Sequence, residues 1–326
     1  MAERIIFHAD DYGANKEISQ QILDCCKNGG ALNSLSVLPN SPDLEGCMEL
    51  LAPYRERLAI SVHLNLAEGP SVADPRQIPW LVDRRGMFSI SFLKVLLLSF
   101  TGRRRELKRQ IRIEMEAQIG RMLPYVNTLR IDSHQHYHMI PIVLESILEV
   151  VGAGGAVRRR KKAGASSGRP AVKDGRESKK MPEIEFIRIP AEPVLPFLKQ
   201  PAFYRTYRPV NLVKQAVLRI LYRMDRKLLA PYQEKSAVFF GILLSGSMDL
   251  KRVETLLPDF RRIADKRGIP LEVLCHPGGV KDARTLMDSE NRDCASFYTA
   301  PGRRAEKDML LHIARKRSWD GQEDLS

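Results

Sequence analysis

Short apolar runs alternate with longer segments of helical periodicity along most of this chain. The runs are rich in β-branched and other apolar residues, which predicts strands, and apolar positions three or four residues apart predict a helix after most of them. The strands are expected at residues 4–9, 32–38, 58–66, 128–132, 184–189, 237–244 and 271–275, and the helices at 16–28, 42–54, 105–123, 141–151, 209–229, 251–266 and 304–316. Repeated strand and helix units favour an α/β fold over a β-sandwich.

One long excursion interrupts this alternation between the third strand and the helix expected at 105–123. It covers residues 67–102, which is too long for a simple connection and is typical of a lid or a binding loop. Its apolar stretch, residues 92–100, is about half the length of a membrane span and contains Lys94. We therefore expect a buried helix or a lid helix there, and no membrane span.

The net charge of +13 is concentrated in one segment. Residues 158–180 hold ten Lys and Arg against two acids, for a local charge of +8, so the rest of the chain carries an unexceptional +5. Residues 152–181 are rich in glycine and poor in large apolar residues, which predicts a basic, disordered insertion within a single domain spanning residues 1–320. No aromatic residues interleave with the charges, so we expect no nucleic-acid partner.

The cysteines and the first residues bear on the cellular compartment. The chain has five cysteines and no C-x-x-C pair, which favours free thiols in a reducing compartment. The first residues lack the apolar run of a signal peptide. We expect a cytoplasmic protein and leave open a homodimer.

Ionisable side chains lie at the ends of five expected strands. They are Asp10 and Asp11, then His63, then His134, His136 and His138, then Arg188, and finally His276. Each group alone is compatible with a turn, a helix cap or a packed side chain. Together they match a β/α barrel, in which the active site forms at the carboxyl ends of the strands.

The residue types in these groups favour metal chemistry. His134, His136 and His138 would share a face if the segment were extended, and a metal or a proton relay explains three such imidazoles better than packing does. One carboxylate and two imidazoles leave metal positions open for water and substrate, as in catalytic sites. A second aspartate and a further histidine would then supply the base and the acid of a hydrolysis.

Five motifs in order along the chain resemble those of the YdjC-like carbohydrate deacetylase family, which includes the chitooligosaccharide deacetylases. They are His8-Ala-Asp-Asp-Tyr-Gly13, Val62-His-Leu-Asn-Leu-Ala-Glu-Gly-Pro70, Asp132-Ser-His-Gln-His-Tyr-His138, Arg188-Ile-Pro190 and Cys275-His-Pro-Gly278. The resemblance runs from residue 4 to about residue 315. It implies a distorted (β/α) barrel of about seven strands and hydrolysis of an N-acetyl group from an amino sugar.

The resemblance also implies a role for each of these residues. The metal ligands would be Asp11, His63 and His134; Asp10 would be the general base, His276 the general acid, and Arg188 would orient Asp10. Asp132 would accept a hydrogen bond from the ring nitrogen of a ligand histidine that does not face the metal. His8 and Tyr12 stand where the family has Asn and Phe, and the first change bears on substrate preference.

The metal and the scissile bond stay open at this point. The family is associated with one Mg²⁺ ion, whereas two imidazoles and a carboxylate suit Zn²⁺ or another transition metal better. A metal-dependent hydrolase of another bond, such as a phosphoester, is one alternative. A binding protein that acts through the basic insertion is the other.

Overall fold

The sheet has seven parallel strands in a spatial order that largely follows the chain. The computed structural model describes residues 5–27, 29–163 and 181–319. The strands are β1 (Ile5–Tyr12), β2 (Ser34–Val37), β3 (Ala59–Leu64), β4 (Leu129–Ser133), β5 (Ile184–Ile187), β6 (Val238–Phe240) and β7 (Leu271–Cys275). Their order is β5-β4-β3-β2-β1-β7-β6, so all the carboxyl ends meet at one edge.

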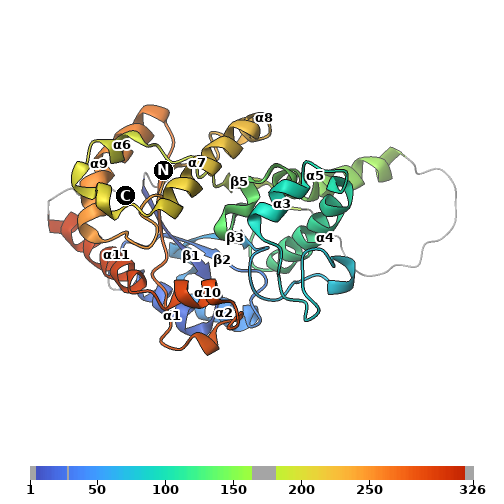
Figure 1. Ribbon diagram of the computed structural model, residues 1–326, viewed down its shortest axis with the longest axis horizontal. Helices are drawn as coiled ribbons and strands as arrows, with labels where there is room; N and C mark the ends of the chain where they lie inside the picture. The colour runs from blue at the N-terminus through green and yellow to red at the C-terminus, as the bar shows by residue number, and fades with distance from the viewer. Residues whose placement is uncertain (1–4, 28, 164–180, 320–326) are drawn as a thin grey trace.

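The two outer strands of the sheet approach each other. The backbone amide of Ile187 in β5 donates a hydrogen bond of 2.9 Å to the carbonyl of Lys235, three residues before β6 begins. The sheet is therefore curled into a half-barrel, with helices packed around it in Figure 1. This confirms the expected α/β fold, a distorted barrel of seven strands in a single domain.

Some helices begin or end at residues that satisfy their terminal backbone groups. The Asn15 side chain accepts the amide hydrogen of Ile18 at the start of α1, and Gly268 ends α9 in the left-handed conformation. The α-helices are α1 (Lys16–Asp24), α2 (Leu44–Leu51), α3 (Phe92–Leu98), α4 (Arg104–Met122), α5 (Pro141–Ala163), α6 (Leu195–Leu198), α7 (Pro209–Met224), α8 (Arg226–Leu229), α9 (Leu250–Arg267), α10 (Arg292–Tyr298) and α11 (Gly302–Trp319). Within the described ranges, none of them has both the length and the apolar content needed to cross a bilayer.

Two further predictions from the sequence concern segments outside the sheet. The stretch 92–100 contains α3, as expected, but only Val95 of this helix is buried. The buried helix is therefore wrong, and the lid helix stays a prediction. The helix α5 extends to Ala163, into the segment expected to be disordered. Residues 164–180 lie outside the described residues, so the disordered insertion stays a prediction. The five cysteines are free and buried, as expected.

Candidate metal and catalytic site

Two consecutive aspartates at the end of β1 reach the same space inside the half-barrel. Successive side chains of a regular strand point to opposite faces. Here the pairing of β1 with β2 shifts register between Ala9 and Tyr12, and Asp11 has a φ of 69°, which is the left-handed region. As a result, Asp10 Oδ2 and Asp11 Oδ1 lie 3.8 Å and 3.4 Å from the same atom, Nε2 of His63. The bulge is what lets neighbouring carboxylates serve one site.

Asp11, His63 and His134 converge from three different strands. His63 lies near the end of β3, and His134 follows β4 as the first residue of the short helix η3 (His134–Met139). His134 Nδ1 is 2.9 Å from Asp11 Oδ1, and the two imidazole rings lie 5.6 Å apart in an edge-to-face arrangement. One potential ligand atom from each of the three residues lies within 4.8 Å of the others. The geometry therefore allows all three to hold one ion.

Two atoms of this cluster have no hydrogen-bond partner among the described residues. They are His63 Nε2 and Asp11 Oδ2, and both are buried. Buried polar atoms are rarely left without partners, and atoms that bind a metal are a common reason when they are. The other nitrogen of His63, Nδ1, lies 2.7 Å from Asp132 Oδ1, which fixes the ring with Nε2 toward Asp11. The residues present thus fit a divalent ion.

The charges around the cluster are dominated by carboxylates. Burial lowers the pKa of His63, but the nearby Asp10 and Asp132 more than offset this and raise that pKa to about 9. Burial also opposes protonation of His134, yet Glu68 and Asp11 hold its pKa well above the ordinary value. The surrounding carboxylates therefore favour positive charge on both imidazoles. The site attracts positive charge, which a divalent metal would also supply.

Asp10 is held by a buried arginine, which follows β5, the strand at one end of the sheet. Arg188 follows β5 and is fully buried, and its two terminal nitrogens donate hydrogen bonds of 2.9 Å to the two oxygens of Asp10. It also lies 3.1 Å from Asp132 and 2.7 Å from Glu272. Although burial raises the pKa of Asp10, Arg188 and His63 hold it well below its usual range. Asp10 is therefore an oriented, ionised carboxylate.

His8, Asp10 and Asp132 form a second group of potential metal ligands. In this group His8 is occupied by hydrogen bonds to neighbouring side chains. The ring nitrogens of His8 lie 2.8 Å from Ser34 Oγ and 2.6 Å from Ser36 Oγ. Both nitrogens are therefore engaged, unlike Nε2 of His63. His8 thus supports Asp10, whose Oδ1 lies 3.3 Å from His8 Nε2.

His276 follows β7, the neighbour of β1. Ala9 pairs with Cys275 in the parallel ladder, so Asp10 and His276 occupy the next positions of adjacent strands. The backbone amide of His276 donates to Glu306, whose carboxylate lies 3.6 Å from His276 Nδ1, and the ring packs edge-on against Phe297. Although burial raises the pKa of Asp11, the neighbouring His134 and His63, and to a smaller extent His276, hold it well below its usual range. The histidine is therefore held beside the cluster.

The three histidines of the H-x-H-x-H run do not share a face, and the expectation that they would is wrong. Gln135 and His136 have φ values of 51° and 61°, so the chain turns sharply instead of continuing extended. Only His134 joins Asp11 and His63. His138 bonds to Ser133 Oγ and to the carbonyl of Arg188, at 2.6 Å and 2.9 Å, and burial lowers its pKa to about 4. It is a neutral structural residue that helps to place Arg188.

Two residues at the site were missed from the sequence. Glu68 Oε2 lies 3.4 Å from His134 Nε2, on the side of the ring opposite Asp11. It stands five residues after His63 in the same motif, which was the available signal. Lys214 on α7 is the other: burial lowers its pKa, while Asp10 and Asp11 act in the opposite direction. No motif surrounds Lys214, so the sequence offered no signal for it.

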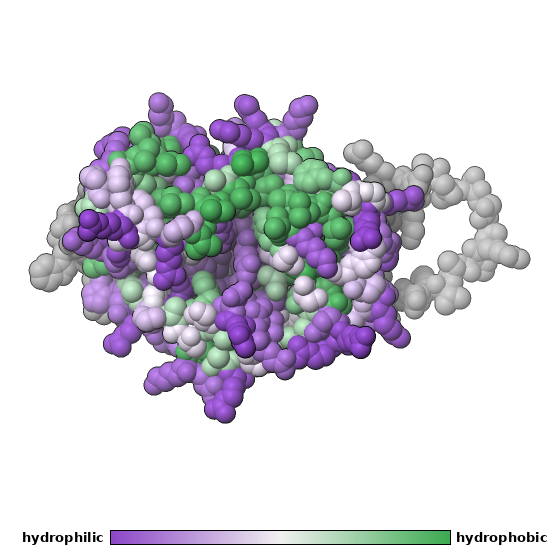
Figure 2. Space-filling model, viewed as in Figure 1, coloured by the Kyte–Doolittle hydropathy of each residue, from purple (hydrophilic) through white to green (hydrophobic). Residues whose placement is uncertain are grey.

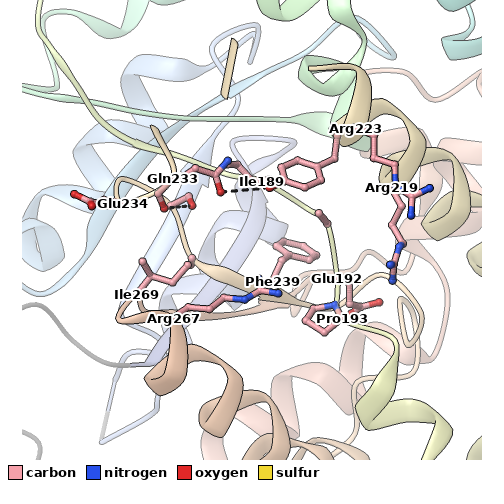
Figure 3. Close-up of a pocket in the computed structure, with 14 residues that line it drawn as sticks. Ile189, Glu192, Pro193, Arg219, Arg223, Gln233, Glu234, Phe239, Arg267 and Ile269 are labelled. Carbon is pink, nitrogen blue, oxygen red and sulfur yellow. Dashed lines mark hydrogen bonds between the residues drawn. The ribbon is translucent and has the colours of Figure 1, made fainter. Parts of the chain in front are cut away.

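A separate cavity of about 510 Å³ lies beside the gap between β5 and β6 (Figure 3). Arg219, Arg223 and Arg267 line it together with Glu192. Phe239 also lines it, and its ring lies 5.6 Å from the Arg188 guanidinium and 5.7 Å from the His136 ring. This cavity is thus a neighbour of the cluster and contains none of the proposed ligands.

Glu192, at the edge of this cavity, is expected to make stability depend on pH. Burial raises its pKa from 4.5 to about 7, against three backbone amides that donate to it. The folded pKa exceeds the unfolded one, so its contribution is complete below pH 4.5 and is lost as the pH rises through 7. Relative to Glu192→Gln, the wild type should lose roughly 3 kcal/mol of unfolding free energy over that range. Urea unfolding of both proteins across the range measures this, and parallel curves would refute it.

A family model and several curated relatives point to the same family for this chain. Residues 4–319 match the family described as YdjC-like protein. The chain is 30% identical over 149 residues to a carbohydrate deacetylase of Thermoanaerobacter pseudethanolicus, which is 45% of this chain and 55% of that protein. It is 28% identical over 162 residues to a carbohydrate deacetylase of Danio rerio, covering 48% and 49%, and 30% identical over 151 residues to a chitooligosaccharide deacetylase of Yersinia pestis, covering 43% and 53%. The matches span about half the length of these relatives.

A solved structure shares the fold. The protein comes from Enterococcus faecalis and is named for cellobiose-phosphate cleavage. It superposes with a TM-score of 0.57 at 18% identity, covering 97% of this chain and 95% of that one. At this identity the likeness bears on the fold alone.

Proposed function

Because the chain belongs to the YdjC-like family, we propose that it is a metal-dependent hydrolase that removes an N-acetyl group from an acetylated amino sugar or oligosaccharide. The names of its relatives, carbohydrate and chitooligosaccharide deacetylases, support the substrate class. The observation that carries the proposal is the pair of buried atoms without hydrogen-bond partners, His63 Nε2 and Asp11 Oδ2, beside an oriented Asp10.

In this proposal Asp11, His63 and His134 hold one divalent ion. Such an ion would polarise the acetyl carbonyl and lower the pKa of the attacking water. The mixed nitrogen and oxygen donors support Zn²⁺ or another transition metal, and Mg²⁺ is the ion associated with the family. Asp132 positions His63 through the 2.7 Å contact to Nδ1.

Asp10 takes the proton of the water that attacks the acetyl carbon. Its Oδ2 lies 3.8 Å from His63 Nε2, so a water near that nitrogen is within hydrogen-bond reach. Arg188 fixes both oxygens of Asp10 and keeps the carboxylate ionised. The low pKa makes Asp10 a weak base, and this suits a water that is already acidified.

His276 donates a proton to the leaving amine as the C–N bond breaks. One water proton goes to Asp10, and the OH group becomes part of acetic acid, which ionises to acetate by releasing its proton to solvent. The nitrogen of the amino sugar takes the proton of His276, and proton return from Asp10 to His276 through solvent restores both groups. Glu306, 3.6 Å from His276 Nδ1, helps to hold the ring with its other nitrogen toward the site. The two proton-transfer groups thus come from the neighbouring strands β1 and β7.

Asp10→Asn and His276→Ala should each lose on the order of 10²-fold or more in turnover and still bind metal, because neither residue is a ligand. Turnover and metal content are measured on the same samples. His312→Ala, an exposed histidine on α11, is the control and should match the wild type. Wild-type turnover of an N-acetyl amide by His276→Ala would refute the acid role.

A panel of substrates separates this function from the alternatives. The metal-loaded protein is assayed for acetate release from N-acetylated sugars and for phosphate release from sugar phosphates. Release of acetate alone is expected. Release of phosphate alone would favour the phosphoesterase, and release of neither would favour a binding protein acting through residues 152–181.

A further inference from the structure

The exposed large apolar side chains are concentrated on one face of the molecule. Of the thirteen among the described residues, twelve lie within residues 93–100 and 195–228. They are Leu93, Leu97, Phe100, Leu195, Leu198, Tyr204, Val210, Leu212, Val213, Ile220, Met224 and Leu228. Figure 2 shows apolar side chains gathered in a band across the face on which α3, α6 and α7 lie, above a hollow. We call residues 91–105 and 195–228 the apolar face.

The helix α7 exposes large apolar side chains on its outward side. Its inward side carries Leu218 and Leu221 in the core, together with Asn211 and Gln215, whose side-chain amides donate hydrogen bonds to buried acceptors. Its outward side carries Val213, Ile220 and Met224, which are 63%, 55% and 47% exposed. The outward side of a surface helix is normally polar. The outward apolar side of α7 is therefore not explained by packing within this chain.

The helix α3 is similarly open. Val95 is its one buried residue, whereas Leu93 and Leu97 are 61% and 59% exposed, and Phe100, two residues after the helix ends, is 66% exposed. These three lie about one turn apart, so they form a single stripe. The patch formed with α7 is far larger than the isolated apolar residues that are normal on a protein surface.

The same face is strongly basic. Residues 91–105 and 195–228 contain twelve Lys and Arg and one acid, the buried Asp225. Of the twelve, Lys214 lies near Asp10 and Asp11, Arg219 and Arg223 line the cavity described above, and Arg104 and Lys199 pair with Glu145 and Asp259. The other seven are all exposed: Lys94, Arg103, Arg105, Arg205, Arg208, Arg226 and Lys227. Two copies of this face would repel each other, which argues against a second copy as the occupant. The apolar residues are mostly aliphatic, which argues against stacked bases of a nucleic acid. An occupant must be apolar inside and anionic at its surface.

We propose that the apolar face docks onto an anionic lipid bilayer. Helices that lie at a bilayer surface combine leucine and phenylalanine, which enter the acyl boundary, with lysine and arginine, which meet the anionic headgroups. The apolar stripes of α3 and α7 supply the first, and the basic residues between and beside them supply the second. No membrane span is involved.

Bilayer contact at this face places the site next to the membrane. Both α3 and α7 pack around η3, the segment that begins with His134. The ring of Phe92 in α3 lies 5.2 Å from that of Tyr137 in η3, whose hydroxyl donates to the carbonyl of Ile90. Substrate would then reach the strand ends along the headgroup region.

Flotation of the full chain with lipid vesicles tests this inference without any assay of activity. The wild type should bind vesicles of phosphatidylcholine with phosphatidylglycerol, and bind pure phosphatidylcholine far less. Leu97→Gln with Phe100→Gln, and separately Val213→Gln with Ile220→Gln, should each weaken binding by about tenfold or more. Trp80→Gln, the exposed apolar residue outside the face, is the matched control and should bind as the wild type does.

All four positions are exposed, so the melting temperature should be unchanged in both double variants. The inference is overturned if the wild type does not bind anionic vesicles. It is also overturned if both double variants bind as the wild type does, which would assign the attraction to charge such as that of residues 158–180. A shift from dimer to monomer in the variants, with vesicle binding unchanged, would show that a second copy covers the face instead.

Discussion

Replacing His63 with alanine should remove both the bound metal and the activity while the fold survives. Its Nε2 is the buried atom aimed at Asp11 without a hydrogen-bond partner, so alanine deletes a ligand and the ion loses one of three protein donors. Asp11→Ala and His134→Ala should behave alike. Metal content of purified, metal-exposed protein and turnover on an N-acetylated sugar are the measurements.

A substitution of Asp132, which contacts the other nitrogen of His63, should reduce metal binding only in part. Asp132 contacts His63 Nδ1 and is not one of the three proposed ligands, so Asp132→Asn should weaken metal affinity by about 10- to 100-fold rather than abolish binding. His136→Gln should retain full occupancy, since His136 lies outside the cluster. Full metal occupancy in His63→Ala would contradict the ligand assignment and direct attention to the second group, His8, Asp10 and Asp132.

Removing the Arg188 guanidinium should have the largest effect on stability. The side chain is fully buried and lies against Asp10, Asp132 and Glu272, so Arg188→Met leaves three carboxylates together without their cation. Breaking a buried pair in this way typically costs about 3–5 kcal/mol. Denaturant unfolding measures the loss of unfolding free energy.

Two further variants show whether charge or geometry is responsible. Arg188→Lys keeps the cation but loses the two-pronged contact with Asp10, so it should recover part of the stability and little of the turnover. Arg76→Met removes a fully exposed arginine paired with Asp74 and should leave stability nearly unchanged. Equal unfolding free energies for Arg188→Met and the wild type would show that the buried network does not hold the half-barrel together.

Much of the fold could be predicted because each strand is a short apolar run and each helix has a regular period. The boundaries were less predictable where a distant residue competes for the backbone. The run 237–244 predicts one long strand, yet β6 ends at Phe240. Glu192 accepts the amide hydrogens of the next three residues, so they cannot extend the ladder. A buried acid 49 residues away leaves no mark on the local pattern.

The site was predictable to the extent that its residues stand at strand ends. Asp11, His63 and His134 come together because the parallel sheet brings those ends to one edge. The prediction that the three histidines of the H-x-H-x-H run share a face was wrong because Gln135 and His136 adopt left-handed conformations. The alternation of histidines along the sequence does not reveal such conformations. Lys214 and the apolar face depend on how α7 packs over η3, which the sequence of α7 alone does not specify.

Acetate release from an N-acetylated chito-oligosaccharide, followed as metal is returned to chelated protein, tests the central claim most directly. The chelated protein should release no acetate above background, and activity should rise linearly to a maximum at one ion per chain. His63→Ala should stay at background throughout the titration. Undiminished acetate release by the chelated protein, or none at full loading with any of Zn²⁺, Mg²⁺ or another divalent metal, would contradict the account.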